Sequence, residues 1–87
     1  MDTVHKKTQM WSVYLLKCSD GTIYTGCTSN LETRLEAHKS GKVNYSSSRL
    51  PIDLNCYIAF KDKYKAYDFE RYLKSGSGKA FSQKRFI

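Results

Sequence analysis

Side chains that could cooperate in cutting a phosphodiester follow one another along this chain. Two tyrosines ten residues apart, Tyr14 and Tyr24, are followed by Arg34 and His38, and a carboxylate, Glu70, stands further downstream. A phenolate can take a proton from water, and a guanidinium can neutralise the charge that develops on a phosphate. A lone carboxylate can hold one divalent metal ion. These residues could therefore hydrolyse a phosphodiester if the fold brings them together.

A β-hairpin is the element that must position the two tyrosines. Each tyrosine stands in a β-rich run, and the Asp-Gly pair between the runs indicates a turn. A two-residue loop would direct the two rings to opposite faces of the sheet. A three-residue loop that ends in a left-handed Gly21 pairs Tyr14 with Gly26 and Leu16 with Tyr24, so both phenols share one face. We predict this loop, with a bulge at Gly21, although either tyrosine alone is also typical of a half-buried strand.

A helix is expected directly after the hairpin, and it carries the arginine and the histidine. Ser29 and Glu32 match a capping box, and Gly41 is typical of a residue that ends a helix. The spacing of Arg34 and His38 places both on one face of this helix, in a stripe with two leucines. Either the edge of that stripe is solvated, or it lines a polar pocket beside the hairpin.

The second half of the chain predicts one more strand and two helices. Residues 54–60 are expected to form the strand, residues 62–75 a long helix and residues 79–85 a short one, with a turn over 76–79. Glu70 falls beside the apolar face of the long helix. Because a buried carboxylate is costly unless it is paired or bound to metal, Glu70 is either a metal ligand or the partner of a nearby cation.

Composition and charge indicate one small basic domain that meets a polyanion. The 87 residues carry a net charge of +7, and nucleic acid is the commonest soluble polyanion. Residues 42–53 are rich in serine, and they could either contact phosphates or form a surface loop. The cations expected to contact the nucleic-acid backbone are Lys17, Lys42, Arg49, Lys74 and Lys79.

The cysteines and the apolar segments argue against several other classes. Cys18, Cys27 and Cys56 are an odd number without metal-ligand spacing, which indicates reduced thiols in a cytoplasmic protein and disfavours a zinc site. No apolar run is long enough to span a membrane, and no signal-peptide core is recognised. Residues 1–10 are expected to form a flexible arm, and residues 11–87 a single folded domain.

The combined pattern resembles the GIY-YIG nuclease superfamily, particularly its small single-domain bacterial members. The first family motif stands here as Ser12-Val13-Tyr14, and the second stands as Tyr24-Thr25-Gly26. Residues 28–38 are similar to the family's helix with its arginine and histidine, and residues 66–74 to the segment with its single acidic metal ligand, here Glu70. No element is specific alone, but their order and spacing together are.

The resemblance implies both a fold and an activity. The fold is a small α/β (α+β) domain, a three-stranded antiparallel sheet flanked by helices in the order β-β-α-β-α-(α). The activity is endonucleolytic hydrolysis of phosphodiesters with one divalent cation, Mg²⁺ or Mn²⁺. Tyr14 and Tyr24 would take the paired tyrosine roles, one as general base, and Arg34 would bind the scissile phosphate. His38 would hydrogen-bond a tyrosine or assist proton transfer, and Glu70 would ligate the metal.

The chain departs from the family pattern after the glutamate. Many catalytic members carry an asparagine there, and here Ser75, Ser77 or Ser82 would have to substitute for it. DNA is the expected substrate, with branched or damaged structures as candidates. Because the chain carries no extra DNA-binding domain, either its discrimination between substrates is weak or a protein partner supplies it. The alternative is a basic nucleic-acid-binding module with little or no catalysis.

Overall fold

A three-stranded antiparallel sheet forms the centre of the structure, a computed structural model that describes residues 9–87. Its strands are β1 (Trp11–Lys17), β2 (Ile23–Thr28) and β3 (Asp53–Phe60), with β1 between the other two. β2 is therefore an edge strand of the described sheet. Most of the expected N-terminal arm, residues 1–8, lies outside the described residues.

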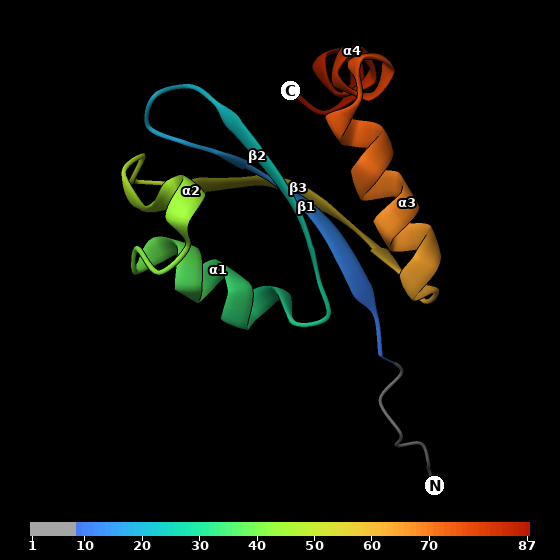
Figure 1. Cartoon of the computed structure of the whole chain (residues 1–87), viewed down its shortest axis with the longest axis horizontal. Helices are drawn as coiled ribbons and strands as arrows, with labels where there is room; N and C mark the ends of the chain where they lie inside the picture. Colours follow the sequence, from blue (N-terminus) through green and yellow to red (C-terminus); the bar gives the residue numbers. More distant parts are fainter. Residues whose placement is uncertain (1–8) are drawn as a thin grey trace, which may run out of the picture.

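Helices cover both faces of this sheet. Helices α1 (Leu31–Lys39) and α2 (Asn44–Ser47) lie on one face, and α3 (Lys63–Lys74) and α4 (Gly76–Arg85) lie on the other (Figure 1). This is the fold class that the sequence predicts, with one additional helical turn, α2, in the serine-rich stretch. Within the described part of the chain, none of the helices has the length and apolar character required to cross a membrane.

The hairpin has the three-residue loop that the sequence predicts. Tyr14 is paired with Gly26 and Leu16 with Tyr24, so both phenols project from the same face of the sheet. Gly21 has a φ of +87°, the left-handed conformation that glycine adopts without strain. The turn chemistry thus sets the register that brings the two tyrosines together.

The pairing of β3 with β1 contains a bulge that the sequence did not predict. The register shifts between Leu15 and Leu16 of β1, and Asn55 is the residue of β3 left out of the pairing. The side-chain amide of Asn55 donates to the carbonyl of Phe86 at 2.6 Å, just after α4. The bulge therefore ties an edge of the sheet to the last helix.

Helix α1 begins one residue later than the predicted capping box. Its N-cap is Asn30, whose side chain accepts a hydrogen bond from the Thr33 N–H at 3.1 Å. The expectation of Ser29 as the cap is therefore wrong. Asparagine caps a helix as well as serine does, and Thr28 Oγ1 accepts from the Asn30 N–H at 3.0 Å, which fixes Asn30 at this position. The helix ends just before Gly41, whose φ of +78° confirms the expected helix-ending glycine.

The corner between α3 and α4 differs from the turn predicted for residues 76–79. Ser75 ends α3 and also caps α4, because its Oγ accepts from the Gly78 N–H at 3.1 Å. Residues 76–79 therefore form the first turn of α4. A Cβ atom on Gly78 would collide with the carbonyl of Tyr72, so this glycine allows the two helices to meet closely.

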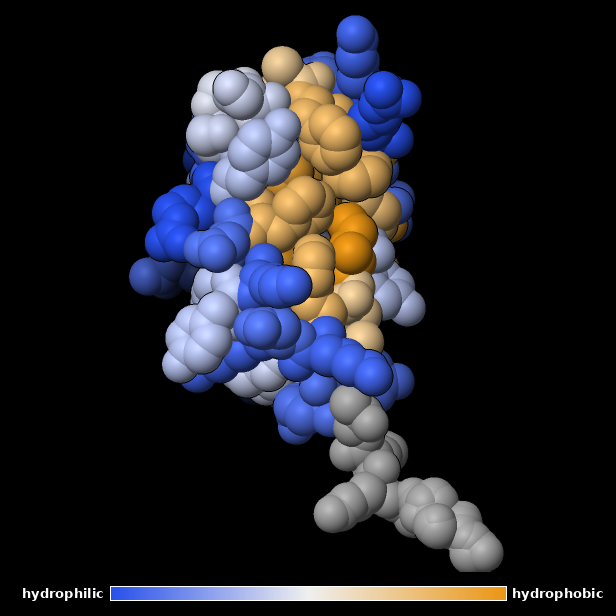
Figure 2. Space-filling model, turned by 90° about the vertical axis from the view of Figure 1, so that its right-hand side faces the viewer, coloured by the Kyte–Doolittle hydropathy of each residue, from blue (hydrophilic) through white to orange (hydrophobic). Residues whose placement is uncertain are grey.

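The hydrophobic core lies between the sheet and helices α3 and α4. Val13 and Leu15 on β1 pack with Ala66 and Leu73 on α3, and all four are buried. Figure 2 looks at the molecule from this side and shows a band of apolar side chains between hydrophilic ones. Aromatic residues that pack around the core are Trp11, Phe60, Phe69, Phe81 and Phe86.

Candidate active site

Tyr14 is the centre of a buried polar cluster on the face of the sheet that α1 covers. Its side chain is 1% exposed, and its hydroxyl lies 3.1 Å from His38 Nε2 and 3.3 Å from Arg34 Nε. His38 Nδ1 lies 2.7 Å from Ser46 Oγ on α2. The arginine and the histidine of α1 therefore belong to a buried polar cluster beside the hairpin, and neither of them lines the cavity next to β2.

One arrangement of protons gives every polar group of this cluster a partner. Arg34 can only donate, so the Tyr14 oxygen accepts from Arg34 Nε. The Tyr14 proton is then donated to His38 Nε2, which leaves the Nδ1–H of a neutral imidazole for Ser46 Oγ. The Ser46 hydroxyl donates to the carbonyl of Val43 at 3.5 Å. Each group therefore donates to the next one in a single direction, from Arg34 to Tyr14, then to His38 and finally to Ser46 of α2.

Burial keeps both titratable rings of this cluster neutral. It raises the pKa of Tyr14 from an ordinary value of 10.0 to about 12, although the hydrogen bond from Arg34 acts in the opposite direction. Burial is also the main cause that lowers the pKa of His38, and the positive charge of Arg34 is the second cause. Tyr14 is therefore a protonated phenol at neutral pH and a poor base.

Tyr24 is the more accessible of the two phenols. It is half-buried, and it lines a cavity of about 550 Å³ beside β2. Its ring centroid lies 4.8 Å from that of His38 and 6.1 Å from that of Tyr14. The glycine of the second motif permits this arrangement, since a Cβ on Gly26 would collide with the hydroxyl of Tyr14. Two tyrosines can share one face here because the residue opposite Tyr14 has no side chain.

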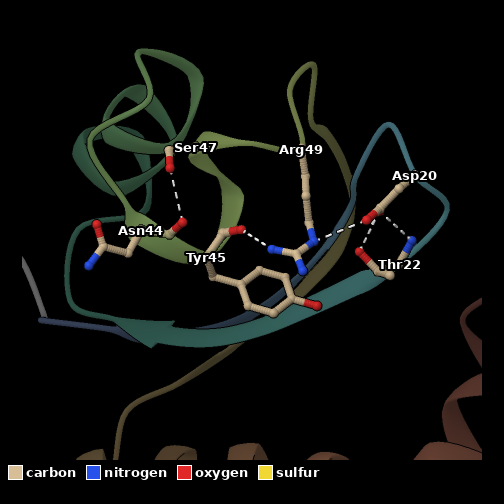
Figure 3. Close-up of polar contacts among 6 residues, drawn as sticks. All are labelled: Asp20, Thr22, Asn44, Tyr45, Ser47 and Arg49. Carbon is tan, nitrogen blue, oxygen red and sulfur yellow. Dashed lines mark hydrogen bonds and ion pairs between the residues drawn. The ribbon is translucent and has the colours of Figure 1, made fainter.

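Tyr45 of α2 packs against Tyr24. Arg49 contacts Tyr45 and forms an ion pair with Asp20 of the hairpin turn (Figure 3). The centroids of the two rings are 5.2 Å apart, and the guanidinium carbon of Arg49 lies 4.2 Å from the Tyr45 centroid. Arg49 Nε lies 3.0 Å from Asp20 Oδ2 in the hairpin turn. Asp20 also accepts hydrogen bonds from the backbone and the hydroxyl of Thr22. Arg49, which the sequence suggested as a phosphate contact, thus fastens α2 to the hairpin.

Glu70 stands apart from the tyrosine cluster. It lies on α3, which covers the opposite face of the sheet, and its Oε2 is 3.0 Å from Lys74 Nζ. Burial and then the negative charge of Glu70 raise the pKa of the Cys27 thiol on β2, so the carboxylate lies close to this strand. Tyr24 and Glu70 therefore flank β2 from opposite faces. Phosphodiester hydrolysis by these residues requires that all five lie together. The structure brings four of them together, the two tyrosines, Arg34 and His38, and it places Glu70 on the other face of the sheet.

The remaining predicted cations divide into two groups. Lys17, at the end of β1, and Lys42, after α1, are exposed on the surface. Lys74 and Lys79 line the same cavity as Tyr24.

Two residues of the site were not found from the sequence. Tyr45 and Ser46 lie in the stretch 42–53, for which the sequence indicated either phosphate contacts or a surface loop and not contacts with Tyr24 and His38. Both act through partners distant in the chain, because Tyr45 covers Tyr24 and Ser46 contacts His38. The signal that could have found them is the histidine itself, since a buried imidazole requires partners for both ring nitrogens.

Glu70 is the one sequence-predicted metal ligand of the site. No group of three histidines, cysteines or carboxylates that could hold a metal occurs within residues 9–87. One carboxylate nevertheless fits Mg²⁺ or Mn²⁺, because Mg²⁺ keeps several waters and is commonly bound through one or two carboxylates plus substrate phosphates. The exposed Lys74 is a weak competitor for Glu70, since surface ion pairs contribute little free energy. The donor set thus fits a weakly held divalent ion.

Comparison with known proteins assigns the family. The family model described as the GIY-YIG catalytic domain matches residues 10–85. The chain belongs to the GIY-YIG family. The two GIY-YIG motifs coincide with the two strands that present Tyr14 and Tyr24, and the family is one of nucleases.

Similar GIY-YIG proteins are small and bacterial. A UPF0213 protein of Bacillus licheniformis is 40% identical over 75 residues, which cover 85% of this chain and 75% of that protein. A UPF0213 protein of Streptococcus agalactiae is 41% identical over 69 residues, 78% of each chain. The solution NMR structure of a UPF0213 protein of Bacillus halodurans is 36% identical, covers 86% of this chain and 81% of that one, and superimposes with a TM-score of 0.56. This similarity confirms the fold class that the sequence predicts.

Proposed function

We propose that this protein is a metal-dependent endonuclease that hydrolyses phosphodiester bonds of DNA, with Tyr24 as the general base. Membership of a nuclease family supports the class of reaction. The observation that carries the proposal is the meeting of two tyrosines, Arg34 and His38 on one face of the sheet, beside a cavity that Tyr24 lines. The net charge of +7 supports a polyanionic substrate.

Accessibility favours Tyr24 over Tyr14 as the base. A general base must reach the water that it deprotonates, and the Tyr14 side chain is enclosed, with its proton directed to His38. The raised pKa of Tyr14 further opposes its ionisation. Tyr14 is then a positioning residue that orients Arg34 and His38, and Tyr24 is the phenol that meets substrate.

Arg34 is suited to the scissile phosphate. One of its N–H groups is directed to Tyr14 and Tyr24 also lies within reach, and the guanidinium has five N–H donors, which leaves donors for phosphate oxygens. The hydrogen bond with Tyr14 is the largest cause that raises the pKa of Arg34, so the group remains positively charged. A fixed cation at this position would stabilise the charge that develops during cleavage.

Glu70 would hold one Mg²⁺ or Mn²⁺ ion against the α3 side of β2. When bound, the ion would act as a Lewis acid on phosphate oxygens. Lys74 would leave Glu70 on metal binding and become available to the nucleic-acid backbone. Addition of Mn²⁺ should therefore broaden the amide NMR signals of Glu70 and Cys27, and the broadening should be absent in Glu70→Gln.

Nicking of a supercoiled plasmid in the presence of Mg²⁺ or Mn²⁺ tests the proposal. Tyr24→Phe, Arg34→Ala and Glu70→Gln should each reduce the rate by roughly a hundredfold or more, because each removes a group that acts in the transition state. The matched controls Tyr64→Phe and Glu36→Gln change exposed residues of α3 and α1, and they should cut like wild type. Full activity of Tyr24→Phe would overturn the assignment of the base.

A second candidate function is nucleic-acid binding with little or no catalysis. The separation of Glu70 from the tyrosine cluster, together with its pairing to Lys74, favours this alternative. It predicts tight binding to DNA and no metal-dependent product from linear, nicked or branched substrates. The plasmid assay, combined with a binding measurement at low salt, distinguishes the two functions.

A further inference from the structure

The cavity beside β2 has more space and more lining residues than the proposed cleavage reaction requires. It extends from Tyr24 and Tyr45 on one side of the edge strand to the facing surfaces of α3 and α4 on the other, with a volume of about 550 Å³. Small-molecule sites in proteins have volumes of roughly 300 to 1,000 Å³. The space is therefore adequate for one ligand of modest size, in addition to the scissile phosphate.

A buried hydroxyl of a residue beside this cavity has no partner. Ser82 of α4 is 4% exposed and lines the cavity, and among residues 9–87 no group forms a hydrogen bond with its Oγ. A buried polar group without a partner is unusual in a folded protein, and leaving it unpaired is unfavourable. Since its Oγ is itself closed to solvent, the Ser82 hydroxyl can gain a polar atom of a ligand as its partner once the side chain rotates toward the cavity.

The lining of the cavity defines the chemistry of that ligand. Lys79 supplies one positive charge, and Lys74 supplies a second one when it leaves its ion pair with Glu70, while none of the residues that line the cavity is acidic. The apolar walls are formed by Leu15, Ile23, Leu73 and Ile87. A free phosphate would satisfy the lysines but not the apolar walls, so the ligand has both an anionic and an apolar part.

The rim of the cavity adds two features that fit a planar ring. Tyr24 and Tyr45 present aromatic surfaces there, and Arg49 holds Tyr45 in place. β2 pairs only with β1 among the described strands, so every second residue directs its N–H and C=O away from the sheet toward this side. Stacking surfaces, free backbone groups and a buried hydroxyl are what an unstacked nucleobase requires.

We propose that this cavity binds one unpaired nucleotide of the substrate, next to the scissile phosphate. The base lies between the apolar walls and the tyrosine rim, with a hydrogen bond to Ser82 Oγ. The phosphate of the same nucleotide lies between Lys74 and Lys79. The inference rests on the proposed nuclease function and deepens it, because it makes unpaired DNA beside the cleavage point the substrate class.

NMR titration of the ¹⁵N-labelled protein tests this proposal independently of cleavage. Tetrathymidylate should shift the amide signals of cavity residues such as Ile23, Thr25 and Gln83. An abasic tetramer with the same phosphates should bind about tenfold more weakly, because base stacking on aromatic side chains contributes strongly to single-strand binding. Lys79→Ala should weaken tetrathymidylate binding by about fivefold, since it removes a phosphate contact.

Matched variants separate the cavity from the general basic surface. Lys84 lies on α4 like Lys79 and is exposed, but it does not line the cavity, so Lys84→Ala should bind like wild type. Ser82→Ala should lower the preference for tetrathymidylate over the abasic tetramer, and unchanged thermal unfolding should verify that it folds. Equal binding of the two tetramers, or equal losses in Lys79→Ala and Lys84→Ala, would overturn the proposal.

The two proposals can fail separately. If the protein cuts DNA and the cavity variants cut duplexes with and without an unpaired flap as wild type does, the nucleotide site is wrong while the nuclease function stands. If no substrate is cut but the tetramer binds in the cavity with the expected base dependence, the nucleotide site stands and the catalytic proposal fails.

Discussion

Tyr14 and Tyr24 carry the same phenol, but their surroundings give them different chemistry. Tyr14 is enclosed and hydrogen-bonded to His38 and Arg34, whereas Tyr24 is half-buried beside a cavity. Burial raises the pKa of Tyr14 and lowers that of His38, so both remain neutral and the cluster holds its one-directional chain of hydrogen bonds. Two tyrosines that look alike in the sequence therefore differ in exposure and in hydrogen bonding, which only the folded structure shows.

The raised pKa of Tyr14 makes the stability of the protein sensitive to alkaline pH. The unfolded chain releases the phenolic proton near pH 10, and the folded protein retains it until about pH 12. The free energy of unfolding should therefore be unaffected by this group below pH 10 and should fall by about 2 to 3 kcal/mol as the pH rises to 12. Urea denaturation at several pH values measures this loss.

Tyr14→Phe is the variant that isolates this effect. It should be less stable than wild type at neutral pH, because His38 Nε2 and Arg34 Nε lose a buried partner. It should also lose less stability than wild type between pH 10 and 12. The exposed Tyr64→Phe variant should follow wild type throughout, and parallel pH profiles for wild type and Tyr14→Phe would contradict the assignment.

At the scale of elements, local signals were reliable where short-range chemistry decides the structure. The left-handed Gly21 and the pairing of Tyr14 with Gly26 follow from turn geometry, and the sequence predicted both. The sequence indicated Ser29 as the cap of α1 where the structure has Asn30, because serine and asparagine are nearly equal caps. It indicated a turn over residues 76–79, because Gly76 and Gly78 are typical of turns, where Ser75 instead caps α4. Only the contacts of the folded chain choose between such equivalent signals.

The cap of α1 gives a direct comparison between two adjacent residues. Asn30→Ala should lower the free energy of unfolding by about 1 kcal/mol, since the Thr33 N–H loses its partner at the helix start. Ser29→Ala should change it by only a few tenths of a kcal/mol, because Ser29 is exposed and outside the cap. Thermal or urea denaturation of both variants measures these changes. A larger loss of stability for Ser29→Ala would show that Ser29, and not Asn30, is the N-cap.

At the scale of the molecule, the fold could be predicted from the sequence, but the placement of Glu70 and the tyrosines on opposite faces of the sheet could not. The order of strands and helices follows from periodicity and from the family resemblance, and both the family match and the similar NMR structure confirm it. Whether Glu70 joins the tyrosines depends on which face of the sheet α3 covers. That choice rests on the packing of Ala66 and Leu73 against β1, a contact between residues far apart in the chain.

The net charge of +7 should make DNA binding strongly dependent on salt. The logarithm of the binding constant should fall linearly with the logarithm of the salt concentration, and Lys42→Ala should reduce the slope by about one, as expected for one lost phosphate contact. Fluorescence anisotropy with a labelled duplex measures the slope. Lys65→Ala, on the exposed start of α3, serves as the control, and the same slope for both variants would argue against Lys42 as a contact.

The shared Ser75 at the corner of the last two helices has a mechanical consequence. Ser75 ends α3 and also begins α4, and Gly78 packs closely against the Tyr72 carbonyl. No flexible linker therefore separates the two helices. Lys74 and Lys79 therefore lie on either side of one rigid helix corner. The helix corner thus fixes where the backbone holds Lys74 and Lys79, and any adjustment of the spacing between their charges has to come from the flexible side chains.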